Sequence, residues 1–212
     1  QVVPGYEVLR TLPVGGMGVV YQARDVVLNR VVALKLLPAG GVADAQWLER
    51  FRAEARTVAA LDHPNVVRIY QYGEHKGRPY FVMEYVEGGS LAEKLWSGPL
   101  PAHSAARLLE PVARAVHYVH GRQLIHRDLT PAITPLAGGD TRKAADFGIA
   151  KRPDADQGLT ASQALLGTAA YMSPEQAAGR SRDVGPATDV WALGAVLYET
   201  LTGRPPFRGE SW

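Results

Sequence analysis

Two short acidic motifs lie in the polar middle of the chain, and their carboxylates could take part in phosphoryl transfer. Asp128 ends the tripeptide HRD, where it could accept a proton from a substrate hydroxyl. Asp146 begins the tripeptide DFG, and a carboxylate beside a glycine suits an oxygen-ligated Mg²⁺. Phosphoryl transfer requires both functions. Taken alone, a tripeptide of the first kind is more typical of a polar loop with a surface salt bridge.

A lysine and a glutamate occupy positions where the hydrophobic pattern predicts buried side chains. Lys35 falls on the apolar face of the strand predicted for residues 31–37, and Glu54 on the apolar face of the helix predicted for residues 43–61. Burying either charge without a partner is costly, so we expect an ion pair between them. The pair could be merely structural, or it could orient a lysine that binds phosphate oxygens.

A glycine-rich connection precedes the lysine in the chain. Gly15, Gly16 and Gly18 lie between two predicted strands, and glycines allow backbone amides to approach a phosphate closely. A flexible hairpin turn is the alternative. The order of glycine turn, strand lysine and helix glutamate favours a phosphate site.

Composition excludes several classes of function. The 212 residues are 46% hydrophobic and 21% charged, with a formal net charge of +2, so a polyanion-binding role, and with it a nucleic-acid partner, is not favoured. The absence of cysteine excludes disulfides, thiol catalysis and thiolate metal sites. The longest apolar run, 190–198, is far shorter than the ~20 residues that span a bilayer. Because the chain starts at Gln1, we expect it to be cut from something longer.

Hydrophobic periodicity predicts an α+β protein with two differently built halves. The first half is predicted to be a five-stranded antiparallel sheet carrying one helix, and the second to be mainly helical. The buried helix at the end of the chain is expected to begin at Asp189 as its N-cap. The predicted strands are 6–12, 19–24, 31–37, 66–72 and 80–86, and the predicted helices are 43–61, 104–120 and 189–201.

In this order and spacing the motifs resemble a protein kinase, and most closely the bacterial serine/threonine kinases of the eukaryotic type. The similarity runs from about residue 6 to the end of the chain. It rests on GGMGVVY at 15–21, VALK at 32–35, Glu54, HRDL at 126–129, DFG at 146–148, and GT at 167–168 followed by YMSPEQ at 171–176.

The resemblance implies a bilobal kinase fold, with a nucleotide-binding N-lobe at 1–86 and a partial C-lobe at 87–212 that carries the catalytic loop and activation segment. It implies ATP and Mg²⁺ as cofactors, with Asp128, Lys35 and Glu54 as catalytic residues and Asp146 as the metal ligand. It also implies a column of Val58, His126 and Phe147 anchored by Asp189. The implied nucleotide-binding residues are Leu12, Gly15, Gly16, Gly18, Val20, Ala33, Lys35, Met83, Glu84 and Val86.

The same resemblance implies partners and a cellular location. The expected substrate is a protein with a serine or threonine acceptor, and Thr160 or Ser162 is the expected site of self-phosphorylation. We expect a cytoplasmic protein, or the cytoplasmic domain of a longer membrane-anchored one.

Several residues depart from the family pattern. Ile133 stands where the family has a metal-binding asparagine, and Thr130 where its serine/threonine members have a lysine. Pro13 replaces the first glycine of the loop, and Pro135 the residue below the adenine. These departures motivate an alternative, a pseudokinase that acts as a nucleotide-binding or partner-regulating scaffold. A small-molecule kinase on the same fold is a third possibility.

The family normally continues through further helices beyond the point that corresponds to Trp212. Glu175 is therefore expected to lack its usual arginine partner. Apolar surface of Trp191, Leu197 and Leu201 is expected to be uncovered for the same reason.

Overall fold

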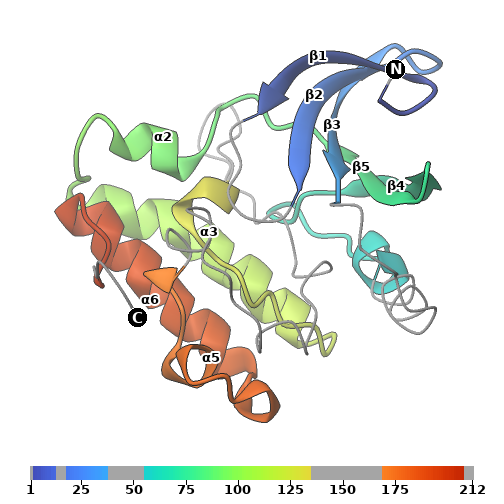
Figure 1. The fold of residues 1–212 in the computed structure, drawn as a ribbon. Coiled ribbons are helices and arrows are strands. Elements are labelled where there is room, and N and C mark those ends of the chain that lie inside the picture. The colour runs from blue at the N-terminus through green and yellow to red at the C-terminus, as the bar shows by residue number, and fades with distance from the viewer. Residues whose placement is uncertain (1, 13–17, 38–54, 135–168, 208–212) are drawn as a thin grey trace. The chain divides into compact units, whose positions relative to one another are not determined.

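The computed structural model describes residues 2–12, 18–37, 55–134 and 169–207, and these form parts of two compact units (Figure 1). The first unit comprises residues 1–62 and 67–85, and the second comprises residues 63–66 and 86–212.

The first unit is built on one antiparallel sheet with the strand order β1-β2-β3-β5-β4. Its five strands confirm the predicted sheet. Of the predicted helix 43–61, only residues 55–59 are both described and helical. The strands are β1 (Tyr6–Leu12), β2 (Val19–Asp25), β3 (Arg30–Leu36), β4 (Ile69–His75) and β5 (Arg78–Glu84).

The last two strands are displaced from their predicted positions: β4 begins three residues later and β5 two residues earlier. The turn before β4 and the turn between β4 and β5 explain these shifts. Residues 63–66 do not extend the strand: the Val66 amide donates to the His63 carbonyl at 3.1 Å, and the His63 ring packs on Tyr118 with 4.8 Å between ring centroids. At the other end, Lys76 and Gly77 have φ of 53° and 71°, the left-handed pair that a two-residue hairpin turn requires. This turn pairs His75 with Arg78 and so sets the register of the hairpin.

The second unit is helical, as predicted, and α3 and α6 lie side by side within it (Figure 1). Apolar residues of α2, α3 and α6 meet in a cluster of Leu91, Leu108, Leu109 and Val196. A residue inside α3, Pro111, does not end that helix. The helices are α2 (Leu91–Leu95), α3 (Ala102–His120), η1 (Pro131–Ile133), α5 (Pro174–Ala177), η3 (Ser181–Asp183) and α6 (Pro186–Thr202).

The predicted start of the last helix is wrong. Gly185, not Asp189, is the N-cap of α6, and the Gly185 amide donates to the Thr188 hydroxyl at 3.3 Å. Pro186 fits the first helical position because its missing N–H would have no helical partner there. Asp189 therefore lies inside the helix, fully buried, where its carboxylate is available to other segments.

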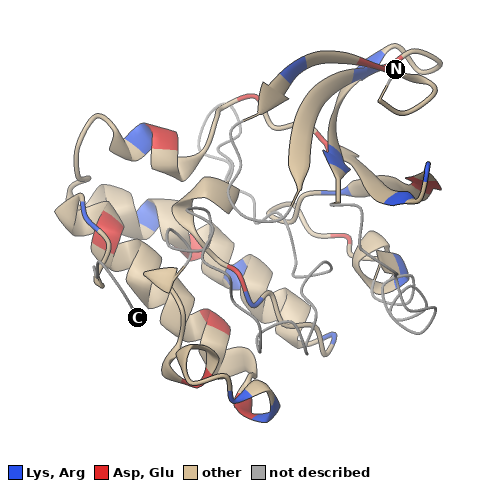
Figure 2. Ribbon diagram, viewed as in Figure 1, with Lys and Arg blue, Asp and Glu red and all other residues tan. Residues whose placement is uncertain are grey.

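The predicted burial of the helix at 189–201 holds for one side of α6 only. Ala192, Ala195 and Val196 are buried, whereas Trp191, Leu197 and Leu201 are 39%, 37% and 39% exposed, which confirms the expectation of uncovered apolar surface. Trp191 stacks on Phe207 with 5.9 Å between ring centroids. Over the described ranges, no helix combines the length and apolarity that a membrane span needs. Basic and acidic residues are interspersed over both units (Figure 2).

Candidate functional site

The sheet of the first unit has two different faces. One face carries an apolar cluster that includes Ala23, Val32, Leu34 and Val82. The opposite face carries Lys35, which is 5% exposed. Side chains alternate along a strand, so Lys35 points away from the face on which Val32 and Leu34 join the apolar cluster.

Strand register brings five of the expected nucleotide-binding residues to one face, that of Lys35. Val20 of β2 lies directly opposite Lys35, and Leu12 of β1 lies opposite Val20. Two residues along β3, Ala33 lies opposite Met83 of β5. Directly opposed residues of an antiparallel pair point to the same face, so these apolar side chains surround the lysine position. Val20, Ala33 and Met83 are 6%, 7% and 8% exposed.

The remaining expected nucleotide residues are only partly described. Gly18 has φ of 102°, and a Cβ there would lie 2.2 Å from the Leu36 carbonyl oxygen, so only glycine fits where the chain enters β2. Glu84 ends β5, where its amide donates to the Arg68 carbonyl at 2.9 Å, and Val86 follows in the second unit. Gly15, Gly16, Glu54, Phe147, Asp146, Thr160 and Ser162 lie outside the described residues, as do Pro13 and Pro135.

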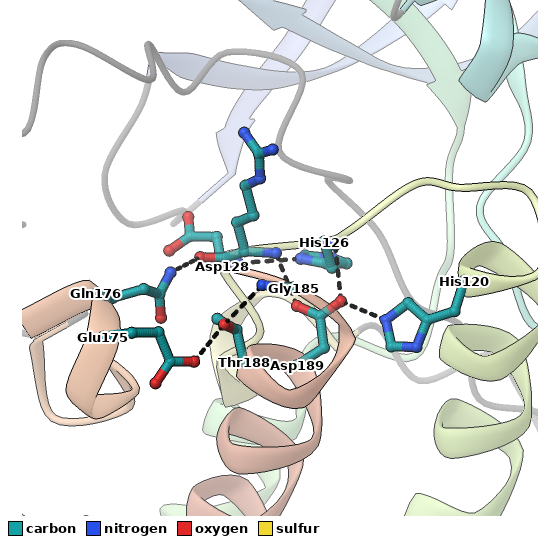
Figure 3. Close-up of polar contacts among 9 residues, drawn as sticks. His120, His126, Asp128, Glu175, Gln176, Gly185, Thr188 and Asp189 are labelled. Atoms are coloured by element: carbon teal, nitrogen blue, oxygen red, sulfur yellow. Dashed lines mark hydrogen bonds and ion pairs between the residues drawn. The ribbon is translucent and has the colours of Figure 1, made fainter. Parts of the chain in front are cut away.

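In the second unit, Asp189 of α6 organises the loop that contains Asp128 (Figure 3). Its carboxylate accepts the His126 amide through Oδ2 and the Arg127 amide through Oδ1, each at 2.8 Å. His120, the last residue of α3, places Nε2 2.7 Å from the same Oδ2. A carboxylate with no exposed surface is tolerated because several donors replace its water.

Arg127 has a backbone conformation that a residue with a side chain adopts at a cost. Its φ is 65°, in the left-handed region, which costs on the order of 1–3 kcal/mol for a non-glycine residue. Its amide is held by Asp189, and its carbonyl accepts a hydrogen bond from Gln176 Nε2 of α5 at 2.8 Å. Contacts from two helices therefore hold the strained residue that precedes Asp128.

The backbone of Asp128 is held as well. Its amide donates to His126 Nδ1 at 3.3 Å, so this nitrogen carries no proton, and His126 is completely buried. Asp128 lines a small pocket next to the loop. The pocket is lined by Arg127, Asp128, Leu129, Tyr171, Met172, Gln176 and Ala192.

Two of the residues that depart from the family pattern after Asp128, Thr130 and Ile133, are buried. Ile133 is 7% exposed and packs with Val116, Leu129 and Ala192. The Thr130 carbonyl accepts the Thr134 hydroxyl at 3.1 Å. Ile133 therefore belongs to the core below the loop, where its alkyl side chain offers no ligand for a hard cation.

Glu175 of α5 is not left without a partner. Its Oε1 accepts the Thr188 hydroxyl of α6 at 2.5 Å (Figure 3). This hydrogen bond, more than any other effect, lowers the pKa of Glu175 from its ordinary value. Thr188 and Asp189, consecutive in α6, thus hold α5 and the loop that contains Asp128, respectively.

A second link ties the segment before α5 to α6. The Tyr171 hydroxyl donates to Glu199, and burial together with this contact raises the pKa of the phenol well above its ordinary value. Tyr171 also lines the pocket beside Asp128. One wall of that pocket is therefore held by α6.

Sequence reasoning identified Asp128 but missed most of what holds it in place. The contact of Gln176 with the Arg127 carbonyl and the contact of His120 with Asp189 were not predicted. A signal for the position of Gln176 exists: SPEQ fits the capping-box pattern with proline at the first helical position. The structure has this box, in which Gln176 Oε1 accepts the Ser173 amide at 3.1 Å.

Comparisons with known proteins agree with this geometry. The model of the protein kinase domain matches residues 6–211. The serine/threonine-protein kinases PknB of Mycobacterium leprae and PrkC of Bacillus subtilis are each 42% identical to this chain over 97% of it. The chain spans only 34% and 32% of the length of these two relatives.

Solved structures agree as well. The kinase domain of Mycobacterium tuberculosis PknI, solved as a point mutant, superimposes with a TM-score of 0.77 at 31% identity. The match covers 97% of this chain and 76% of that one, and both parts of the described fold are those of a kinase domain. The chain therefore belongs to the protein kinase family.

Proposed function

We propose that this chain transfers the γ-phosphate of ATP to a serine or threonine hydroxyl of a protein substrate. The observation that carries the proposal is the loop around Asp128, in which buried Asp189, together with Gln176, holds a strained backbone and Asp128 lines a pocket. A general base must be held rigidly to act on a bound hydroxyl, and this loop meets that requirement.

The residues of the first unit fit a nucleoside triphosphate. Lys35 supplies a buried ammonium, which we propose binds phosphate oxygens and is oriented by Glu54. The apolar side chains of Leu12, Val20, Ala33 and Met83 fit the planar adenine, because they share the face of Lys35. We propose that Gly15, Gly16 and Gly18 approach the phosphates and that backbone groups of Glu84 and Val86 bind the adenine edge.

The residues of the second unit fit the transfer step. Asp128 would accept the proton of the acceptor hydroxyl as the hydroxyl oxygen bonds to the γ-phosphorus, while the bond from that phosphorus to the bridging oxygen breaks and ADP leaves. We propose that Asp146 would hold Mg²⁺, which would supply positive charge to neutralise the phosphates. We further propose that residues 1–86 serve the nucleotide and residues 87–212 the acceptor protein, and that the domain acts in the cytoplasm, where ATP is supplied.

Phosphate incorporation with ATP and Mg²⁺ or Mn²⁺, with the sites mapped by mass spectrometry, tests the proposal. We expect phosphate on Thr160 or Ser162 and on a serine- or threonine-containing protein substrate. Asp128→Asn keeps the side-chain shape and should lower the rate by about 10²-fold or more, because the general base is lost. Lys35→Met should abolish most of the activity.

The matched control is Asp183→Asn, which removes a carboxylate that forms an exposed pair with Arg180 in η3. This variant should keep the wild-type rate. A folded wild-type chain that incorporates no phosphate would contradict the proposal and favour a nucleotide-binding scaffold. Equal rates in wild type and Asp128→Asn would contradict the assignment of the base.

A further inference from the structure

We infer that Gln176 is a positioning residue for the transfer reaction, acting on Asp128 through the peptide group that joins Arg127 to Asp128. The inference rests on the proposed function, because it takes Asp128 as the base. Gln176 belongs to α5, the helix formed by the SPEQ sequence, and its amide reaches the catalytic loop (Figure 3).

One peptide group is held at both of its polar ends. Its carbonyl oxygen, that of Arg127, accepts Gln176 Nε2 at 2.8 Å. Its N–H, that of Asp128, donates to His126 Nδ1 at 3.3 Å. Rotation of this peptide group would break both hydrogen bonds, so the pair defines the direction in which Asp128 leaves the loop.

The conformation of Arg127 makes such a restraint necessary. With φ of 65°, Arg127 could return to an ordinary backbone conformation if its neighbouring peptide groups were free to turn. Asp189 holds the preceding peptide group through the Arg127 amide at 2.8 Å. Gln176 holds the following one, so the two contacts restrain opposite sides of the strained residue.

The orientation of the Gln176 amide is determined chemically. Its Oε1 accepts the Ser173 amide at 3.1 Å, and its Nε2 faces a carbonyl oxygen. The reversed amide would set two donors against each other at one end and two acceptors at the other. An amide is therefore required at this position, since it must accept at one end and donate at the other.

Gln176→Glu separates these two functions. The glutamate keeps the acceptor for the Ser173 amide, so the cap of α5 survives, but it sets an oxygen against the Arg127 carbonyl. We expect kcat to fall roughly tenfold to a hundredfold with the KM for ATP changed less than about threefold, because the base is misplaced while nucleotide binding is untouched. Gln176→Ala should act in the same direction.

Ser173→Ala is the matched control. It removes the Ser173 hydroxyl, which accepts the backbone N–H of Gln176 at 3.4 Å. It keeps the backbone N–H of Ser173, which donates to Gln176 Oε1 and so orients the Gln176 side chain. The variant should lose some stability and keep kcat within about threefold, which separates loss of a helix cap from loss of the contact to the loop.

A second readout does not depend on activity. Hydrogen exchange of the Asp128 amide and the ¹⁵N shift of His126 Nδ1, both measured by NMR, report on the hydrogen bond at the other end of the same peptide group. Both should change in Gln176→Glu and stay as in wild type in Ser173→Ala.

The outcomes are distinct. If wild type transfers no phosphate, the proposed function fails, and the NMR signals alone test whether Gln176 holds the peptide group. An unchanged kcat in folded Gln176→Glu overturns the inference. A reduced kcat with unchanged Asp128 exchange and an unchanged His126 shift also overturns it, because the effect would then not pass through this peptide group.

Discussion

Single residues around Asp128 show how packing and chemistry share one short segment. Leu129 and Ile133 belong to an apolar cluster with Val116 and Ala192, and Leu129 also lines, with the preceding residue Asp128, the pocket beside the loop. The family asparagine is replaced by a residue that the core uses. Replacing Ile133 with asparagine would therefore disturb the apolar cluster as well as add a possible metal ligand.

Ile133→Asn should destabilise the chain by about 2–4 kcal/mol, because it removes apolar burial and places an amide among alkyl groups. Denaturant unfolding measures this change. Ile133→Val, the control for volume alone, should cost about 0.5–1.5 kcal/mol. An asparagine variant as stable as wild type would mean that the amide finds partners at this position.

Among the elements, α6 does the most to arrange the site. Thr188 holds Glu175 of α5, the next residue Asp189 holds the catalytic loop, and Glu199 holds Tyr171. All three lie on one helix, so the relative positions of these segments follow from the rise and rotation of a single rigid element.

Thr188→Val should raise the pKa of Glu175 toward its ordinary value of 4.5, because the hydroxyl that stabilises the carboxylate is lost. With a lowered pKa in the folded state, this carboxylate stabilises the fold above its unfolded pKa, and the contribution disappears as pH falls through the folded pKa. The loss of stability on acidification through and below the ordinary pKa of 4.5 should therefore be smaller in the variant.

NMR titration of the Glu175 side chain and thermal unfolding across this pH range measure the two effects. The Thr188 hydroxyl also accepts the Gly185 amide, so the variant should be less stable at every pH. The test is therefore the change in stability with pH, and not the stability at any one pH. Thr200→Val in the same helix is the control, since the buried Thr200 hydroxyl donates to the Val196 carbonyl. An unchanged Glu175 titration in Thr188→Val would contradict the assigned cause.

On the scale of the whole molecule, the proposed reaction draws on both compact units. Lys35 belongs to the first unit and Asp128 to the second. Each is prepared by contacts inside its own unit, through strand register for Lys35 and through Asp189 and Gln176 for Asp128. Nucleotide binding is therefore expected to be measurable apart from transfer.

ATP with Mg²⁺ at about 100 times its Kd should stabilise the folded chain by about 2.7 kcal/mol, because a ligand that binds only the folded state adds its binding free energy to stability. Thermal unfolding with ATP, with and without EDTA, measures the shift. Lys35→Met should lose most of it, and Gln176→Glu should keep it. A shift indifferent to EDTA would favour the scaffold alternative over the kinase.

The sequence by itself determined the class of fold and the order of the elements. Runs of β-prone residues predicted all five strands, with β4 and β5 displaced by three and two residues from their predicted positions. Helical periodicity located α3 and α6 within three residues. The family motifs needed no structure either, because they are read from residue types and spacing.

Only the tertiary structure decided how the candidate site is held. The residues around Asp189 predict that it caps the last helix, but Gly185 and Pro186 start that helix earlier. The Asp189 carboxylate is therefore available to bind the loop that contains Asp128. Strand β4 begins late because the His63 ring packs on Tyr118 of α3 and the Val66 amide donates to the His63 carbonyl. Gln176 reaches Arg127 across 49 positions of sequence, and no local pattern encodes such a contact. These features depend on which segments pack together, and that is settled only when the whole chain folds.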